Sequence, residues 1–237
     1  MTDQPPASNP APISVLIVED HEIMRFSLKK ALDKFQSLKV LGEAVNGLDA
    51  IEKTRQLNPT VVIMDIGLPE LNGIDATRLI KNEHPETRVV MLTSFDDEQR
   101  TFASLAAGAD AYCSKSIETP ELVRVIEKVY NGCGWLDATV ARHVFKVCEK
   151  EVSGETMERV EDASFQDFED DEALSMLSSR ELQILKLMMF GHDETEIAMR
   201  LAVDVDAVRF SVRKILNKLA SDERTQNYLA YLQPGMA

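Results

Sequence analysis

Short apolar segments that stop at polar residues constrain the fold of this chain more than any other feature. They are residues 13–18, 61–64, 88–92 and 111–113, and the polar residues that follow them include Glu19, Asp20, Asp65, Thr93 and Lys115. Residues 38–44 form a further segment that suits an edge strand. Apolar runs without alternation are typical of strands buried on both faces of a parallel sheet. The sequence therefore predicts five parallel strands with polar groups at their carboxyl ends.

Five segments between or after these runs carry apolar residues at helical spacing. They are residues 22–35, 48–57, 74–82, 98–107 and 120–131. Strict alternation of strands and helices predicts a doubly wound α/β fold with a five-stranded parallel sheet, of the flavodoxin-like type. Because such sheets bind ligands beyond the carboxyl ends of their strands, the polar residues that end the strands are expected to converge at one edge.

Glu19, Asp20 and Asp65 are expected to form an acidic group at that edge. Carboxylates that lie close together repel one another unless a cation neutralises them, and Mg²⁺ suits oxygen ligands and bridges to phosphate. A carboxylate can also attack phosphorus and form an acyl phosphate, with Lys115 and Thr93 binding phosphoryl oxygens. Each residue alone is more often an ordinary loop residue, but the set at the ends of several strands indicates a site.

The C-terminal part is helical throughout from Ser178 onward, with helices expected over residues 180–190, 194–201, 205–219 and 223–232. The third of these has an apolar face made by Val208, Val212, Ile215, Leu216 and Leu219. Its opposite face is polar and mostly basic, holds Asp206, Arg209, Phe210, Arg213 and Asn217, and is flanked by Lys214 and Lys218. Arg, Lys and Phe at such positions can contact guanine edges, phosphates and thymine methyl groups. On this helix alone, a solvated amphipathic face is the more common explanation.

The formal net charge of −14 is distributed unevenly along the chain. Residues 149–172 hold 11 Asp+Glu and two Lys+Arg, residues 1–148 carry a net −5, and residues 173–237 are neutral. The overall acidity therefore does not exclude a nucleic-acid partner for the helical part. The acidic segment is expected to be a solvated tether. A sharper hypothesis is that residues 161–172 mimic phosphate and rest on the basic helix.

Residues 13–132 resemble the receiver domain of bacterial two-component response regulators. The resemblance rests on Val-Glu-Asp-His-Glu at 18–22, Met-Asp-Ile-Gly-Leu-Pro-Glu-Leu-Asn-Gly at 64–73, Leu-Thr-Ser at 92–94 and Gly-Ala-Asp-Ala-Tyr-Cys-Ser-Lys at 108–115. It implies that Asp65 is the phosphoacceptor and that Mg²⁺ is held by Glu19, Asp20, Asp65 and the carbonyl of Gly67. It also implies switch roles for Thr93 and Tyr112 and a phosphate-binding role for Lys115. Ile117 departs from the proline that many receivers have there.

Residues 177–219 resemble the NarL/FixJ (LuxR-type) helix-turn-helix. The matching residues are Leu-Ser-Ser-Arg-Glu-Leu-Gln-Ile-Leu at 177–185, Gly191, Glu-Ile-Ala-Met-Arg-Leu at 196–201, Ala-Val-Arg at 207–209 and Ile-Leu-Asn-Lys-Leu at 215–219. The resemblance implies that the helix over 205–219 enters the DNA major groove and that residues 223–232 form a dimer contact. Ala207 and Ser211 replace the usual Thr and His, and Asp206 places an acid on the expected DNA face. These departures put DNA affinity and sequence choice in question.

Together these features predict a transcriptional regulator with a disordered leader (1–12), a receiver (13–132), an extension helix (133–148), an acidic linker (149–172) and an all-α four-helix DNA-binding domain (173–237). A sensor histidine kinase would phosphorylate Asp65, and the active homodimer would bind double-stranded DNA and engage the transcription machinery. The chain would not be an enzyme beyond its own phosphorylation and autodephosphorylation. One alternative is a regulator whose helix-turn-helix binds a protein instead of DNA, and another is a phosphatase that uses the Asp65 pocket.

The chain shows no apolar run long enough to span a bilayer and no signal-peptide pattern, so a cytoplasmic protein without a membrane partner is expected. Its three cysteines, Cys113, Cys133 and Cys148, have no metal-ligand spacing. Free thiols are therefore expected. Cys113 lies in an apolar strand and is expected to be a core residue, while a redox role for Cys133 or Cys148 stays open.

Overall fold

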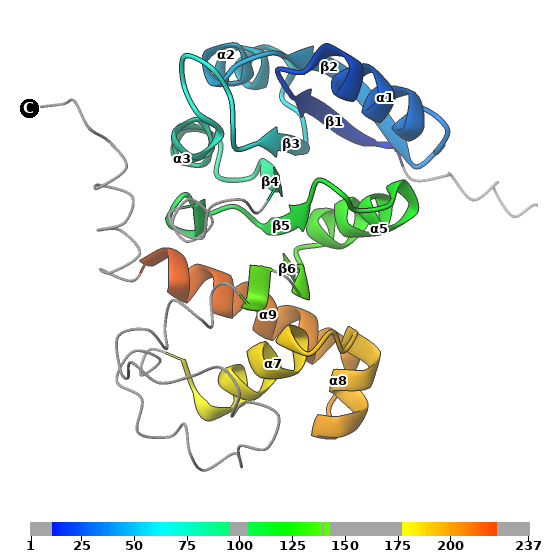
Figure 1. Ribbon diagram of the computed structural model, residues 1–237, viewed down its shortest axis with the longest axis vertical. Coiled ribbons are helices and arrows are strands. Elements are labelled where there is room, and N and C mark those ends of the chain that lie inside the picture. Colours follow the sequence, from blue (N-terminus) through cyan, green and yellow to red (C-terminus); the bar gives the residue numbers. More distant parts are fainter. Residues whose placement is uncertain (1–10, 95–103, 139, 143–176, 222–237) are drawn as a thin grey trace, which may run out of the picture.

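Parallel strands form the centre of an N-terminal α/β part in the computed structural model of this chain (Figure 1). The structure describes residues 11–94, 104–138, 140–142 and 177–221. The strands in these ranges are β1 (Ile13–Val18), β2 (Leu38–Ala44), β3 (Val61–Asp65), β4 (Arg88–Thr93), β5 (Ala111–Ser114) and β6 (Trp135–Leu136). They follow the order β2-β1-β3-β4-β5-β6, and all neighbours are parallel. This order confirms the doubly wound α/β arrangement.

Among the described residues the sheet has six strands, one more than the sequence predicts, because β6 adds to the edge beside β5. Trp135 donates its backbone N–H to the carbonyl of Asp110, and Asp137 donates to the carbonyl of Tyr112. Leu136 is buried in the core. A two-residue strand is too short to produce a periodic pattern in the sequence, so the sequence could not predict that it pairs with β5. Beyond β6, residues 138 and 140–142 are helical.

The helices cover both faces of the sheet. They are α1 (Glu22–Leu32), α2 (Gly47–Leu57), α3 (Gly73–Glu83) and α5 (Thr119–Tyr130). Alternate residues of the central strands face opposite cores, so Val62 and Met64 pack with buried residues of α2 and α3. Val61 and Ile63 pack instead with buried residues of α1 and α5. The strands read as continuous apolar runs because both of their faces are covered.

The C-terminal helical part consists of α7 (Ser179–Met189), α8 (Glu194–Leu201) and α9 (Val205–Ser221). Ser178 and Asp193 begin α7 and α8 with capping boxes, in which the cap side chain and a glutamate three residues later exchange hydrogen bonds with the backbone. The five apolar residues predicted for the third helix are all buried, which confirms its core-facing side: Val208, Val212, Ile215, Leu216 and Leu219.

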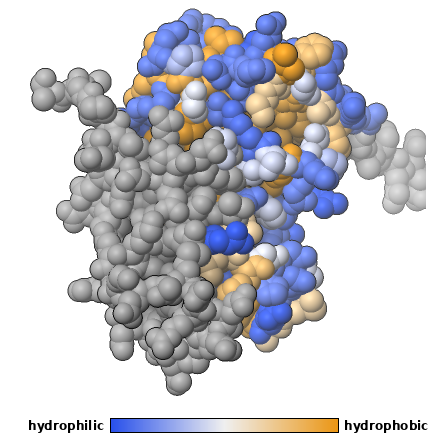
Figure 2. Space-filling model, viewed as in Figure 1, coloured by the Kyte–Doolittle hydropathy of each residue, from blue (hydrophilic) through white to orange (hydrophobic). Residues whose placement is uncertain are grey.

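Several predicted segments lie outside the described residues. These are residues 1–10 of the leader, the acidic segment 149–172, most of the helix expected over 98–107 and the helix expected over 223–232. Residues 104–106, at the end of the first of these helices, are helical. In the described part of the chain, no helix is both long and apolar enough to cross a bilayer. The described surface that Figure 2 shows is mostly hydrophilic, with scattered hydrophobic patches.

Candidate functional site

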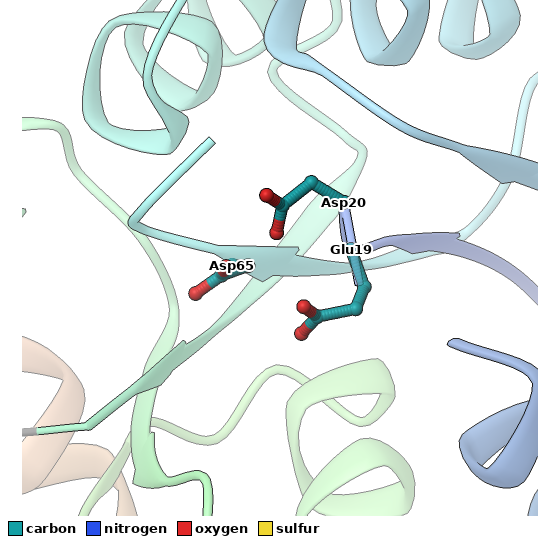
Figure 3. A group of neighbouring side chains, drawn as sticks. All are labelled: Glu19, Asp20 and Asp65. Atoms are coloured by element: carbon teal, nitrogen blue, oxygen red, sulfur yellow. The ribbon is translucent and has the colours of Figure 1, made fainter. Parts of the chain in front are cut away.

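Three carboxylates meet at the carboxyl ends of β1 and β3, as the sequence predicts. Glu19 and Asp20 follow β1, and Asp65 ends β3, which is paired to β1 through Val18 and Met64. One oxygen atom of each carboxylate lies within 4.8 Å of one from each of the others (Figure 3). Glu19 and Asp65 are buried, whereas Asp20 is exposed. We call these three residues the acidic pocket.

Lys115, after β5, reaches into the acidic pocket and binds two of its members. Its Nζ atom lies 2.9 Å from Glu19 Oε2 and 2.8 Å from Asp65 Oδ2. Burial raises the pKa of the Glu19 carboxyl, opposed by the hydrogen bond from Lys115, while the charge of Asp65 adds to the rise. Burial alone would lower the pKa of Lys115, but its hydrogen bonds to Asp65 and Glu19 outweigh burial and raise it. A charged lysine therefore neutralises only part of the pocket's negative charge.

The chemistry of the donor set fits a hard divalent cation. Three carboxylates with oxygen atoms within 4.8 Å of one another supply the ligands that Mg²⁺ prefers, and the exposed Asp20 leaves one side open to water and phosphate. Gly67 lies beside the pocket, since a Cβ atom built on it would be 3.8 Å from Asp65 Oδ2. The sequence thus brings the expected metal-binding residues together at one edge of the sheet.

The two expected switch residues lie on neighbouring strands. Thr93 is the last residue of β4 and pairs in register with Ser114 of β5. Tyr112 is fully buried, and its hydroxyl donates a 2.6 Å hydrogen bond to the carbonyl of Ser104. Burial also raises the pKa of Tyr112, so the hydroxyl stays protonated. Tyr112 pairs in register with Leu136 of β6 and thereby connects the sheet to the added strand.

Gly73 supports the pocket in a way that sequence reasoning missed. A Cβ atom built on Gly73 would lie 1.8 Å from the carbonyl oxygen of Asp65, so any side chain there would displace the end of β3. The N–H of Gly73 donates to the carbonyl of Ile66 at 3.1 Å. The sequence signal for this contact was the glycine at the end of the segment 64–73, because glycine allows two backbones to approach closely.

The helix α9 packs directly against the α/β part. Arg213 Nη1 donates to the carbonyl of Gly132 at 2.7 Å, and Nη2 lies 3.4 Å from Asp110 Oδ1. A Cβ atom built on Gly134 would lie 2.8 Å from Arg213 Cα, so the two backbones are in contact. In Figure 1, α9 runs below β6. We call the contacts of α8 and α9 with α5, β6 and Asp110 the α9 interface.

Glu194, at the start of α8, is the second acid of the α9 interface. Its Oε2 atom lies 2.8 Å from Arg209 Nε of α9 and 3.0 Å from Lys128 Nζ of α5. The hydrogen bond with Glu194 raises the pKa of Arg209, which also pairs with Asp206 at 2.8 Å. Glu194 and Asp110 were not predicted, because contacts between distant parts of a chain leave no periodic signal.

The six residues expected to contact DNA have different surroundings. Arg209 and Arg213 are paired as described, and Lys218 lies 2.6 Å from Glu181. Phe210, Lys214 and Asn217 are exposed, with Lys214 Nζ 4.8 Å from the centre of the Phe210 ring. Three of the six are therefore held by carboxylates within the chain.

The thiols show no sign of activation where they are described. Cys113 is buried in the sheet, and burial raises its pKa. Cys133 borders a cavity of about 720 Å³ between α5 and α9, and burial raises its pKa as well. Reactive cysteines have lowered pKa values, so neither environment favours redox chemistry. Cys148 lies outside the described residues.

Comparisons with known proteins cover both parts of the chain. Residues 15–127 match the family model of the response regulator receiver domain, and residues 175–230 match bacterial regulatory proteins of the luxR family. The response regulator protein VraR of Staphylococcus saprophyticus is 32% identical over 215 residues, which are 91% of this chain and 94% of that protein. VraR of Staphylococcus aureus is 31% identical over 214 residues, or 90% of this chain and 93% of the relative.

Solved structures of response regulators are similar to this chain. The response regulator ChrA of a heme-sensing two-component system has a TM-score of 0.51 and 25% identity, covering 93% of this chain and 96% of that one. A LuxR-family response regulator from an Aurantimonas species has a TM-score of 0.54 and 27% identity, covering 60% and 99%. RcsB of Salmonella typhimurium, at 21% identity and a TM-score of 0.55 over 93% of this chain and 98% of that one, shares the fold.

A chain with these two domains is a regulator rather than a classical enzyme, with a sensor kinase as the source of its signal and DNA as the target of its luxR-family domain. Its relatives match it over nearly their full length. This chain therefore belongs to the LuxR-type two-component response regulators, which regulate transcription in a phosphorylation-dependent way.

Proposed function

We propose that Asp65 accepts a phosphoryl group from a sensor histidine kinase and that this modification controls dimerisation and DNA binding. The observation that carries the proposal is that Asp65 lies beside the other two acids of the pocket, with the Nζ atom of Lys115 2.8 Å from its Oδ2 atom. A nucleophilic carboxylate needs positive charge nearby to stabilise the incoming phosphoryl oxygens. Lys115 supplies part of that charge.

The transfer follows from the residues of the pocket. An oxygen of Asp65 forms a bond to phosphorus as the bond between phosphorus and the kinase histidine nitrogen breaks. Mg²⁺ held by Glu19, Asp20, Asp65 and the carbonyl of Gly67 would supply the remaining positive charge. Lys115 exchanges its contact with Asp65 for a phosphoryl oxygen. Attack of water on phosphorus later breaks the bond to the Asp65 oxygen, releases inorganic phosphate and restores the carboxylate, so the chemistry stays confined to the chain itself.

The signal would leave the pocket through β4, β5 and β6. Thr93, at the end of β4, binds a phosphoryl oxygen, and Tyr112 of β5 then gives up its hydrogen bond to Ser104. Tyr112 pairs with Leu136 of β6, and β6 packs against α9. Loss of the hydrogen bond between Tyr112 and Ser104 thus biases the equilibrium between docked and released α9.

Released α9 would present Arg209, Phe210, Arg213, Lys214, Asn217 and Lys218 to DNA. Docking and DNA binding compete for Arg213, because its guanidinium cannot bind Gly132 and Asp110 while it binds a base or phosphate. We place the receiver at 13–132 and the DNA-binding domain at 173–237, with residues 133–148 as an extension, 149–172 as a linker and 1–12 as a leader. A bound homodimer would then engage the transcription machinery.

The direct test is retention of random genomic DNA fragments by full-length wild-type protein and Asp65→Asn, each with and without acetyl phosphate and Mg²⁺. Wild type should enrich defined sequences only when phosphorylated, and Asp65→Asn should not respond. Equal enrichment by both proteins under all conditions would show that the receiver does not control DNA binding.

One observation favours a second candidate function, in which the helical domain binds a protein. Asp206 lies in the first turn of α9, pairs with Arg209 and is largely exposed, so it offsets positive charge on the expected DNA face. A gel-shift series at increasing salt separates the candidates, because DNA affinity must fall as salt rises. No retained DNA at any salt concentration would favour the protein partner.

A further inference from the structure

The turn from β1 into α1 carries two of the three acids of the pocket, and a partly buried arginine holds it. Arg25, in the first turns of α1, donates from Nη1 to the carbonyl oxygen of Glu19 at 2.8 Å and to that of Asp20 at 3.3 Å. Its side chain is only 15% exposed. These bonds reach the backbone, so Arg25 acts on the position of the turn and not by pairing with the carboxylates.

Glu43 holds the arginine in turn. Its Oε2 atom lies 3.4 Å from Arg25 Nε, and its Oε1 atom lies 2.6 Å from Lys29 Nζ. Glu43 lies on β2, where it pairs in register with Ile17 of β1, two residues before Glu19. The chain of contacts therefore runs from β2 through Arg25 to the backbone of the turn.

This arrangement matters because, among the described residues, Arg25 is the donor that the carbonyl groups of Glu19 and Asp20 share. The N–H of Glu19 still donates to Ala44 of β2, but the carbonyls of Glu19 and Asp20 point to one guanidinium. Hydrogen bonds from a charged donor are stronger than neutral ones. Without them, the spacing of the two carboxylates relative to Asp65 would be free to relax, and a cation would have to order the turn as it binds.

We propose that Arg25 is a positioning residue for the divalent cation of the acidic pocket and that Glu43 orients it. The inference rests on the proposed Mg²⁺ site and adds residues that support it without touching the ion. Groups that orient metal ligands contribute about 10- to 100-fold to metal affinity. Loss of Arg25 should therefore weaken Mg²⁺ binding rather than abolish phosphorylation.

The test is calorimetric titration of full-length protein with MgCl₂ in the absence of a phosphodonor. Arg25→Met keeps the length of the side chain but removes every donor, and should raise the Mg²⁺ dissociation constant about tenfold or more. Arg25→Lys should recover part of the loss, and Glu43→Gln should cause a smaller rise. The matched control is Arg55→Met, which removes an arginine bound by two hydrogen bonds to Glu83 on the surface between α2 and α3; it should leave the constant unchanged.

A second readout separates positioning from general damage to the fold. At saturating Mg²⁺, the rate of phosphorylation of Arg25→Met by acetyl phosphate should return to within about twofold of wild type, because only the cost of ordering the turn has changed. A folded Arg25→Met, judged by circular dichroism, that binds Mg²⁺ as tightly as wild type would overturn the inference. If Arg25→Met does not fold, an unchanged constant in Glu43→Gln would overturn it instead. Wild type that takes up no Mg²⁺ would overturn the proposed metal site itself.

Discussion

In the acidic pocket three carboxylates lie beside one lysine, whereas at the α9 interface each buried carboxylate holds several cationic groups. Asp110 binds Arg213 of α9 together with Lys81 and Arg88 of the α/β part, and Glu194 binds Lys128 and Arg209. The pocket is therefore short of positive charge, which suits a cation. At the interface the carboxylates neutralise Arg209 and Arg213, so these two side chains are held in place while α9 is docked.

The largest effect should come from removing the central acid of the pocket. Asp65→Asn should show no phosphoryl incorporation from acetyl phosphate, because an amide is not the nucleophile that a carboxylate is. Intact-mass measurement of the treated protein checks this. Asp75→Asn, which changes an acid in the first turn of α3, should retain the mass increase of one phosphoryl group. Phosphorylation of Asp65→Asn would mean that a different residue is the acceptor.

Weakening the interface should release α9 without any phosphodonor. Glu194→Gln removes the charge that holds Lys128 and Arg209, so Cys133 beside the cavity should become more accessible. We expect its reaction with a thiol reagent to accelerate about fivefold, in line with the loss of about one kcal/mol of ion pairing.

The measurement uses a Cys148→Ser background, with the buried Cys113 as an internal reference. Glu121→Gln, which breaks an exposed pair with Arg124 within α5, is the matched control. If both variants react at the wild-type rate, the carboxylate of Glu194 does not hold the docked state.

The burial of Glu19, together with the charge of the neighbouring Asp65, should appear in the pH dependence of stability. The pKa of Glu19 is raised above its ordinary value of 4.5, so the folded chain holds that proton more tightly than the unfolded chain. Its contribution to the free energy of unfolding therefore falls as the pH rises from about 4.5 through the folded pKa. Glu19→Gln should lack this fall and gain stability relative to wild type as the pH rises.

Urea unfolding in EDTA between acid and neutral pH measures that difference. Other carboxylates contribute equally to both proteins, so only the difference between the two curves is diagnostic. A difference that does not vary with pH would mean that Glu19 titrates normally in the folded chain.

The smallest effect is expected from a change that touches neither region. Ala202 follows α8 with φ of 52°, a left-handed conformation that costs an alanine about 1 kcal/mol more than a glycine. Ala202→Gly should raise the free energy of unfolding of the helical domain by about 1 kcal/mol in a denaturant titration. The same variant should bind Mg²⁺ as wild type does, and its Cys133 should react with the thiol reagent at the wild-type rate. These results would show that a change in stability alone does not alter the α9 interface.

The parts of the molecule that sequence patterns predicted are those with local or repetitive causes. The strands were predictable because both faces of the sheet are covered. The proximity of Asp65 and Lys115 was predictable because the carboxyl ends of the strands meet at one edge. The apolar face of α9 follows from helical periodicity. The pairing of β6 and the contacts of Arg25, Asp110 and Glu194 could not be predicted, because each depends on residues that only the completed fold brings together.

The backbone contact between Gly134 and Arg213 has a genetic consequence. A glycine codon becomes an alanine codon by a single base change, and the methyl group so added would lie 2.8 Å from the α9 backbone. That one carbon atom would push α9 away from β6 while leaving every charge in place. Under the proposed function, in which docked α9 is the inactive state, Gly134→Ala should release α9 and change expression of the target genes in the absence of the signal.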